Sequence, residues 1–353
     1  MNSVNRLNDP TRGMEVQTPH HCGRRDFVKG VAALAGAAGL SAFDARSAGA
    51  EPPPEITRIR LDAFPITCIA PQYVAEELLK AEGFTDVQYP AFDGSVGENV
   101  VGAGKVDMDL YAAAPLVASL DAGAPVLILA GVHLGCYELF GNERVRAIRD
   151  LKGRTVAIEA FGGPKHVLLS SMVAYVGLDP RRDINWVVHS SAEGMTLLAE
   201  GKVDAFLGFP PEPQELRAKK VGRVIVNTAT DKPWSQYYCC MLIANRDFAQ
   251  KHPVATKRAV RAVLKAADLC AQQPERAARL LIEKGFAQNY EFTLQTLKEV
   301  RYDAWREYDP NNTIRFHALR LHEVGMIKTS PQKLIAQGTD WRFLNELKRE
   351  LKA

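Results

Sequence analysis

The hydrophobic positions of this chain follow two alternating periods between residues 56 and 207. Short apolar or alternating runs are separated by stretches in which apolar side chains recur at helical spacing. The predicted strands cover residues 56–61, 87–91, 106–110, 126–130, 155–158, 184–188 and 203–207. The run 126–130 is apolar throughout, as expected of a strand that is covered on both faces. Strands alternating with helices predict parallel α/β layers, and the rhythm restarts after Asp150, so we expect such layers twice.

Beyond residue 244 the pattern becomes helical. Apolar residues keep the spacing of a helix that is buried on one side, and turn signals at Asn311-Asn312 and Ser330-Pro331 interrupt it. The sequence predicts helices over residues 253–270, 275–284, 293–302, 316–323, 331–337 and 341–352.

The first fifty residues have the features of an export signal in the usual order. Arg24-Arg25 precede an uncharged run of small and apolar residues at 30–43, and Ala48-Gly49-Ala50 follows it. This order predicts a cleavable signal, and the paired arginines predict the twin-arginine type. The apolar run is shorter than the roughly 20 residues that a membrane-spanning helix needs. We therefore expect a soluble exported chain that begins near Glu51.

The charge balance argues against a partner that is a nucleic acid or an anionic membrane. The chain holds 44 Lys and Arg against 41 Asp and Glu. Residues 1–50 contain six of the basic and four of the acidic residues, which leaves 38 and 37 in the expected mature chain. A nearly neutral chain offers no basic surface for phosphate backbones or anionic lipids.

Cysteine usage separates this chain from secreted proteins that are stapled by disulfides. Five cysteines lie beyond residue 50: Cys68, Cys136, Cys239, Cys240 and Cys270. An odd number leaves at least one thiol unpaired, and adjacent cysteines rarely bridge each other because the bond is strained. The spacings do not match a zinc site. The sequence therefore predicts free thiols, with no cofactor and no resident metal.

Candidate ligand contacts follow from sheet geometry, because ligands of open parallel sheets lie outside the carboxyl ends of the strands. Aromatic side chains in the corresponding loops could stack on a flat ligand; they are Phe64, Tyr111, Tyr137, Phe161, Phe209, Trp234 and Tyr237. Gly94, Ser95 and Gly162 offer backbone N–H groups to an anion or a carbonyl oxygen. The same loops contain Thr67, Cys68, Ala112, Cys136, Glu138, His166 and Glu212.

The mixture of these side chains favours a small organic ligand over a small inorganic anion. Lys165 and His166 are the cationic candidates, and the aromatic residues outnumber them. We expect a molecule with an amine, amide or heteroaromatic part; a pyrimidine-like ring fits best, and sulfonates and aromatic acids are the alternatives. A soft metal is a further alternative, because Cys68, Cys136 and one of the paired cysteines fall in these loops together with His166. Packing of free thiols as small apolar groups is the favoured interpretation.

Several short segments carry a family resemblance when they are taken in order. They are Gly-Lys-Val-Asp-Met-Asp at 104–109, Asp-Ala-Gly-Ala-Pro-Val at 121–126, Ile-Arg-Asp-Leu-Lys-Gly-Arg-Thr-Val-Ala at 148–157, Gly-Leu-Asp-Pro at 177–180, Leu-Ala-Glu-Gly-Lys-Val-Asp-Ala at 198–205 and Asn-Arg-Asp-Phe at 245–248. In this order the chain resembles the nitrate/sulfonate/taurine family of periplasmic solute-binding proteins, which includes the NMT1-like branch. The resemblance covers about residues 56–350.

The resemblance implies the two-lobe α/β fold of periplasmic binding proteins (type II), with the ligand cleft between the lobes. Lobe 1 would comprise 55–149 and 245–353, and lobe 2 would comprise 150–244. The lobes would close on the ligand through a hinge at the crossings. The implied function is a monomeric periplasmic protein, not an enzyme, that delivers its ligand to the permease of an ABC importer. The twin-arginine translocase would be a partner during export.

Two other functions stay open at this point. The eukaryotic thiamin-pyrimidine synthase shares the family and uses a lysine that holds pyridoxal phosphate, a donor histidine and a cysteine-rich iron motif. This chain lacks such a run and has only the pair Cys239-Cys240. A ligand-sensing lobe for a signalling partner would use the same closure as a transport protein.

Overall fold

The computed structural model of the chain describes residues 51–92 and 97–351. The export signal expected at 1–50 lies outside the described residues, and so do Gly94 and Ser95. The residues from Pro52 onward form one unit, which contains a two-stranded, a three-stranded and a five-stranded sheet.

The first two sheets are joined, and the second contains a strand that the sequence pattern did not predict. β1 (Arg58–Arg60) pairs in parallel with β2 (Asp86–Gln88), and a bridge from Leu61 to Met108 connects this pair to the next sheet. There, β10 (Tyr238–Asn245) runs antiparallel between β3 (Met108–Ala112) and β4 (Val126–Leu134). The prediction of parallel layers covered residues 56–207 and did not include β10, which the chain enters from the five-stranded sheet and not through a crossover helix.

The five-stranded sheet mixes parallel and antiparallel pairs. Its order is β7 (Ile184–Val188), β6 (Arg154–Ile158), β8 (Ala205–Gly208), β5 (Glu138–Gly141) and β9 (Arg223–Asn227). The first three strands are parallel, as predicted, and β5 is antiparallel to both of its neighbours. The sequence pattern did not predict β5 or β9; Glu138, expected in a loop, is the first residue of β5.

Helices cover these sheets and make up most of the C-terminal third. Up to residue 219 they are α1 (Ala70–Val74), α2 (Glu76–Ala81), α3 (Glu98–Gly102), α4 (Ala113–Asp121), α5 (Pro164–Tyr175), α6 (Ser191–Ala199) and α7 (Glu212–Lys219). Farther along they are α8 (Arg246–Lys251), α9 (Pro253–Gln272), α10 (Pro274–Glu283), α11 (Tyr290–Glu299), α12 (Pro310–Glu323), α13 (Pro331–Gly338) and α14 (Arg342–Glu350). Short 3-10 turns include Thr67–Ile69 and Trp234–Gln236. The six helices predicted beyond residue 244 are confirmed, with ends shifted by a few residues.

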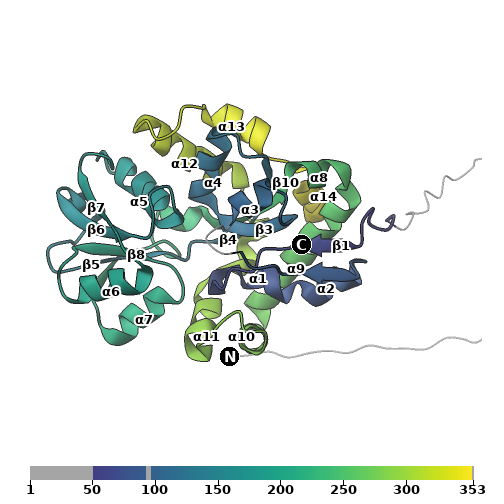
Figure 1. Cartoon of the computed structure of the whole chain (residues 1–353), viewed down its shortest axis with the longest axis horizontal. Helices are drawn as coiled ribbons and strands as arrows, with labels where there is room; N and C mark the ends of the chain where they lie inside the picture. Colours follow the sequence, from purple (N-terminus) through teal and green to yellow (C-terminus); the bar gives the residue numbers. More distant parts are fainter. Residues whose placement is uncertain (1–50, 93–96, 352–353) are drawn as a thin grey trace, which may run out of the picture. The chain divides into compact units, whose positions relative to one another are not determined.

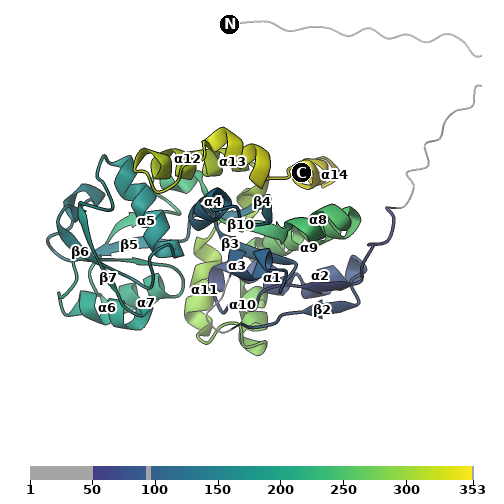
Figure 2. The ribbon, with the colours of Figure 1, turned by 45° about the horizontal axis from the view of Figure 1, so that its top comes forward.

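The sheets and helices divide into two lobes. The five-stranded sheet with α5, α6 and α7 lies on the left of Figure 1, and β3, β4 and β10 lie with α1, α4 and α9 toward the centre and right. After the rotation of Figure 2, α5 still lies beside α4 and α12, which it contacts from the other lobe. Helix α9 packs against β4, α1 and α2, so its buried face completes the core of the first lobe.

Two chain segments cross between the lobes, and hydrogen bonds tie them together. Residues 135–137 lead from β4 to β5, and residues 228–237 lead from β9 to β10. The Tyr137 N–H donates to Thr228 Oγ1 at 2.9 Å, and the Thr228 N–H donates to the Tyr137 carbonyl at 2.9 Å. Gly135 is required here, because a Cβ at this position would lie 2.1 Å from the Thr228 carbonyl oxygen. Both crossings come earlier in the sequence than the predicted ends of the lobe segments at residues 149 and 244. The lobe boundaries themselves stay a prediction.

Within the described residues, no helix is both long and apolar enough to span a bilayer.

Candidate functional site

The largest apolar hollow near the crossings lies between the two lobes and has a volume of about 500 Å³. We call it the cleft cavity. Residues of both lobes line it: Phe64, Ile66, Cys68, Ile69, Glu98, Asn99, Leu110, Tyr111, Ala112, Tyr137, Glu159, Ala160, Phe161, Gly162, Gly163, Pro164, Lys165, Phe209 and Cys240. Its size is within the range of pockets that hold small organic ligands.

Aromatic rings from both lobes face the cleft cavity. Tyr111 ends β3 in the first lobe, Phe161 and Phe209 follow β6 and β8 in the second, and Tyr137 lies on a crossing. The rings of Tyr137 and Phe209 meet edge to face, with their centroids 5.8 Å apart. Phe161 is 63% exposed, so its ring is open to solvent at the mouth of the cavity. These rings can clasp a flat ligand by stacking and edge contacts.

A buried ion network forms the wall of the second lobe, which we call the ionic wall. Lys165 is 1% exposed, and its Nζ lies 2.7 Å from Glu159 Oε1 and 2.8 Å from Glu212 Oε2. It also donates to Ser191 Oγ at 2.6 Å, and Ser191 Oγ donates to Glu159. The ring of Phe206 lies below the ammonium, 4.4 Å away. The two carboxylates compensate the one buried cation, so this wall carries no uncompensated positive charge.

Local sequence explains why these groups meet. Glu159 follows β6, Ser191 begins α6 after β7, and Glu212 begins α7 after β8. The three strands are parallel, so their carboxyl ends lie at one edge of the sheet. Gly162 has a φ of +80°, which turns the chain sharply into α5 and brings Lys165 to the same edge. Burial raises the pKa of Glu212, and the neighbouring Lys165 ammonium opposes that shift.

A second hollow of about 30 Å³, the size of one water molecule, is lined by residues of the two crossing segments. We call it the rear cavity, and Trp234, Tyr237, Cys239 and His317 are among its lining residues. The ring of Tyr237 stacks on Phe316 at 4.2 Å. Trp234 and Tyr237 therefore belong to an aromatic contact between the lobes and not to the cleft cavity.

His317 joins the two lobes beside the rear cavity. Its Nδ1 lies 3.1 Å from Ser171 Oγ, which comes from α5 of the second lobe. The side chain is 4% exposed, and burial lowers the pKa of His317 from its ordinary value of 6.5 to about 4. The imidazole is thus neutral at neutral pH.

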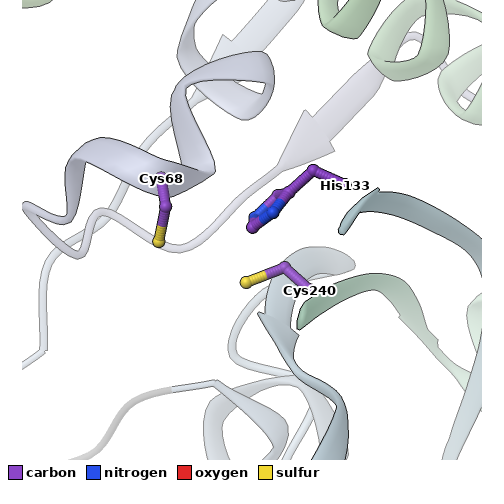
Figure 3. Close-up of side chains that lie close together, drawn as sticks. All are labelled: Cys68, His133 and Cys240. Carbon is purple, nitrogen blue, oxygen red and sulfur yellow. The ribbon is translucent and has the colours of Figure 1, made fainter. Parts of the chain in front are cut away.

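Four thiols and one imidazole gather beside the crossings, and we call them the thiol cluster; two of them, Cys68 and Cys240, line the cleft cavity. A ring nitrogen of His133 and the sulfurs of Cys68 and Cys240 lie within 4.8 Å of one another, and Figure 3 shows the imidazole pointing between the two sulfurs. A ring nitrogen of His133 and the sulfurs of Cys136 and Cys239 also lie within 4.8 Å of one another. Hydrogen bonds from Cys136 and Cys240 lower the pKa of Cys68.

The family assignment rests on a segment that contains most of the lining residues of both cavities. The sequence model described as NMT1/THI5 like matches residues 67–277, well over half of the 353 residues. The chain belongs to the NMT1/THI5-like family. The family resemblance expected from the sequence is thereby confirmed.

Known proteins similar to this NMT1/THI5-like chain include three enzymes of Saccharomyces cerevisiae. They are the 4-amino-5-hydroxymethyl-2-methylpyrimidine phosphate synthases THI5, THI12 and THI13, each 26% identical over 200 residues. The match covers 52% of this chain and 57% of each synthase, so the chain spans little more than half of their length.

Solved structures extend the similarity over nearly all of the described fold. The periplasmic nitrate-binding protein NrtA from Synechocystis PCC 6803 has a TM-score of 0.71 and 16% identity, over 85% of this chain and 90% of NrtA. The alkanesulfonate-binding protein SsuA from Xanthomonas axonopodis pv. citri, bound to MOPS, has a TM-score of 0.64 and 18% identity, over 83% and 99%. At such identities the likeness establishes the fold alone. The predicted two-lobe periplasmic binding protein fold is confirmed.

The structure separates the predicted contact residues of this NMT1/THI5-like chain into three groups. The cleft cavity brings together Phe64, Cys68, Tyr111, Ala112, Tyr137, Phe161, Gly162 and Phe209. The rear cavity takes Trp234 and Tyr237, together with the second faces of Ala112 and Tyr137. Among the described residues, Thr67, Cys136, Glu138, His166 and Glu212 line neither cavity.

The residues that line neither cavity have other partners. Glu138 pairs with Arg217 at the start of β5, and Glu212 pairs with Lys165. His166 accepts a hydrogen bond from the Gly162 N–H at 3.1 Å and lies outside the thiol cluster. The histidine at the thiols is His133 instead.

Sequence reasoning missed two groups that matter for the site. Glu159 directly follows a predicted strand, so the rule of strand carboxyl ends should have selected it. His133 interrupts a buried apolar run in β4, and such a polar residue was the available signal.

Proposed function

We propose that this chain is an extracytoplasmic solute-binding protein, which captures a small organic molecule between its lobes and delivers it to an ABC importer. The observation that carries the proposal is the cleft cavity, whose aromatic walls come from both lobes and whose volume suits such a molecule. The two crossing segments are few residues long, as expected of a hinge that lets the lobes close on a ligand.

The charges around the cleft cavity favour a neutral or cationic ligand. Among the described residues that line it, Lys165 is the only cation, and two carboxylates compensate it within the wall. Glu98 adds one further acidic group to the lining. A nitrate or sulfonate would meet no free cation at this surface, whereas an amine or a nitrogen heterocycle would find acceptors and aromatic faces. A pyrimidine-like ring remains the best match.

Five contacts follow from this proposal. We propose that Tyr111, Tyr137 and Phe209 hold the ring of the ligand, that Glu159 accepts a hydrogen bond from it, and that Phe161 closes the mouth of the cavity. We also propose that the chain has no catalytic activity, acts as a monomer and meets a membrane permease.

A thermal-shift screen of the full chain tests the proposal. The panel holds pyrimidines, amines, aromatic acids, sulfonates and nitrate. A ligand that binds only the folded state stabilises it by about 2.7 kcal/mol at a hundredfold excess over its Kd. We expect the nitrogen heterocycles or amines to raise Tm, Tyr137→Ala to remove the shift, and Phe292→Ala, an aromatic substitution outside both cavities, to keep it.

Two outcomes would contradict parts of this proposal. Conversion of a bound pyrimidine precursor into product would support the synthase alternative. A shift with sulfonates alone would overturn the inference about ligand charge.

Export is proposed separately, from the sequence of residues 1–50. Replacing the pair, Arg24→Lys with Arg25→Lys, should retain the chain in the cytoplasm, because the twin-arginine pathway reads both arginines. Fractionation of cells that express each form measures this.

A further inference from the structure

The thiol cluster is assembled from segments that lie far apart in the sequence. Cys68 comes from the turn Thr67–Ile69, His133 from the end of β4, Cys136 from a crossing, and Cys239 and Cys240 from the start of β10. β10 is antiparallel to β4, so the start of one strand lies at the end of the other. The fold thereby concentrates four of the five cysteines beyond residue 50 around one imidazole.

The imidazole of His133 presents an unused nitrogen to these thiols. His133 is 0% exposed, and its Nδ1 lies 2.8 Å from the Leu134 carbonyl oxygen, which can only accept a hydrogen bond. The proton therefore belongs on Nδ1, and Nε2 carries the lone pair. Among the described residues Nε2 has no hydrogen-bond partner. Metal-binding histidines are oriented in this way, with the second nitrogen fixed by a carbonyl or a carboxylate.

The sulfur positions fit coordination of one ion. A Zn–S bond is about 2.3 Å long, so two sulfurs on one ion lie at most about 4.6 Å apart. The sulfurs of Cys136 and Cys239 lie 3.0 Å apart, and those of Cys239 and Cys240 lie 4.0 Å apart. Small rotations of these side chains would bring three sulfurs and Nε2 to bonding distance of one four-coordinate ion.

The thiol cluster is also accessible to an ion. Cys68 and Cys240 line the cleft cavity, and Cys239 lines the rear cavity. Cys270 provides the contrast within the same chain, because it is buried in α9, lines neither cavity and belongs to neither donor group. Thiols that served only as small apolar groups would need neither the imidazole nor the openings.

We propose that the chain binds one thiophilic metal ion of the Cu(I) or Zn(II) type in the thiol cluster. His133 Nε2 and the thiolates of Cys68 and Cys240 hold the ion, and either Cys136 or Cys239 completes a four-coordinate site. Thiolate and imidazole donors select such soft or borderline ions over Mg²⁺ or Ca²⁺. Each coordinating thiol releases its proton to water when the ion binds. This inference rests on the donor set and is independent of the proposed transport function.

Titration of the full chain, reduced and stripped of metal, tests the proposal. Cu(I) is offered in competition with bathocuproine disulfonate, Zn(II) in competition with a chromogenic chelator, and Co(II) serves as a spectroscopic substitute for zinc. We expect one ion per chain, thiolate-to-cobalt charge-transfer absorption and release of protons. Which of the two ions wins its competition identifies the metal.

Matched variants locate the site. Cys68→Ser, Cys240→Ser and His133→Gln should each weaken binding by about a hundredfold or more, since even the loss of groups behind metal ligands costs about 10- to 100-fold. Cys270→Ser should bind as the unchanged chain does. The Tm of each variant shows whether it has folded.

Alkylation of the thiols in the unchanged chain, with and without metal, tests the site without any variant. Bound metal should slow alkylation at the four cluster thiols and leave the rate at Cys270 unchanged, as read by peptide mass mapping. Absence of binding by all three ions, binding that His133→Gln and Cys68→Ser both leave intact, or a Cys136–Cys239 disulfide in chain isolated with oxygen excluded would each overturn the proposal.

Discussion

The ionic wall and the thiol cluster, on opposite sides of the cleft cavity, differ in how their polar groups are paired. On the ionic wall, Lys165 is enclosed by two carboxylates, a hydroxyl and an aromatic ring, so its charge is satisfied within the protein. Across the cavity, the thiol cluster surrounds an imidazole whose Nε2 makes no hydrogen bond among the described residues. The polar groups of the ionic wall are all paired with one another, whereas the thiol cluster keeps a ring nitrogen that could still bind a metal ion.

The difference indicates that the ionic wall contributes mainly to folding stability, whereas the thiol cluster is available for binding. A buried ion pair is costly to break, because removing one partner leaves the other charged and desolvated. Neutral thiols can be exchanged for similar uncharged groups at lower cost. Substitutions in the ionic wall should therefore act mainly on folding, and substitutions at the thiol cluster mainly on binding.

The largest expected effect is that of removing the buried ammonium. Lys165→Met should lower the free energy of unfolding by about 3–5 kcal/mol, because Glu212 is then buried without its cation. Urea unfolding at neutral pH measures the loss. Lys251→Met, at an exposed pair with Asp247, is the control and should change stability by at most about 1 kcal/mol. If both substitutions have equally small effects on the free energy of unfolding, the ionic wall does not set the stability.

Protonation of His317 should have the next largest effect. The unfolded chain takes up a proton near the ordinary pKa of 6.5, whereas the folded chain does so only near 4. The stability from the neutral imidazole is thus present above pH 6.5 and is lost as the pH falls toward 4, by roughly 3 kcal/mol in total.

Unfolding titrations between pH 7 and pH 4 check this effect. His317→Gln should flatten the dependence in that window, and His322→Gln, at an exposed position of the same helix, should not. An unchanged slope in His317→Gln would assign the pH dependence to other groups.

A smaller effect concerns the two rings that meet across the cavity. Tyr137→Ala and Phe209→Ala should each weaken ligand binding about tenfold, which corresponds to about 1.4 kcal/mol. Their rings touch, so the double variant should lose less than the sum, with a coupling of about 0.5–1.5 kcal/mol. Calorimetric titration with the ligand found in the screen measures the cycle. Strict additivity would show that the ligand separates the two rings.

The smallest effect is expected at the mouth of the cavity. Phe161→Ser should change stability by less than about 0.5 kcal/mol, because the ring is 63% exposed. It should still lower affinity a few-fold, and a faster dissociation rate in stopped-flow measurements would reveal the loss of a closing contact.

The sequence predicted the fold where local periodicity decides it. β6, β7 and the helices from α9 to α14 were found because each repeats its apolar positions over its own length. β5 and β9 were missed, since Glu138–Gly141 is only four residues long and Arg223–Asn227 has a charged start. β10 was also missed, and its antiparallel orientation depends on where the preceding segment ends in space, which no local pattern contains.

The candidate site was predictable as a set of loops and not as a set of contacts. The rule of strand ends placed Phe161, Phe209 and Tyr111 at the cavity. It could not tell that Trp234 and Tyr237 face the rear cavity, because that depends on helix α12, which arrives from the far end of the chain. The pairing of His133 with the thiols has a similar cause, since three segments that are distant in the sequence converge there.

Trp234 shares the rear cavity with Cys239, and this arrangement supplies a built-in optical probe. Heavy and redox-active ions quench the fluorescence of a nearby indole. The fluorescence intensity of Trp234 should therefore fall, without any added dye, when a metal ion binds at Cys239. A Trp234→Phe chain keeps the other three tryptophans and should lose most of this metal-dependent change in fluorescence.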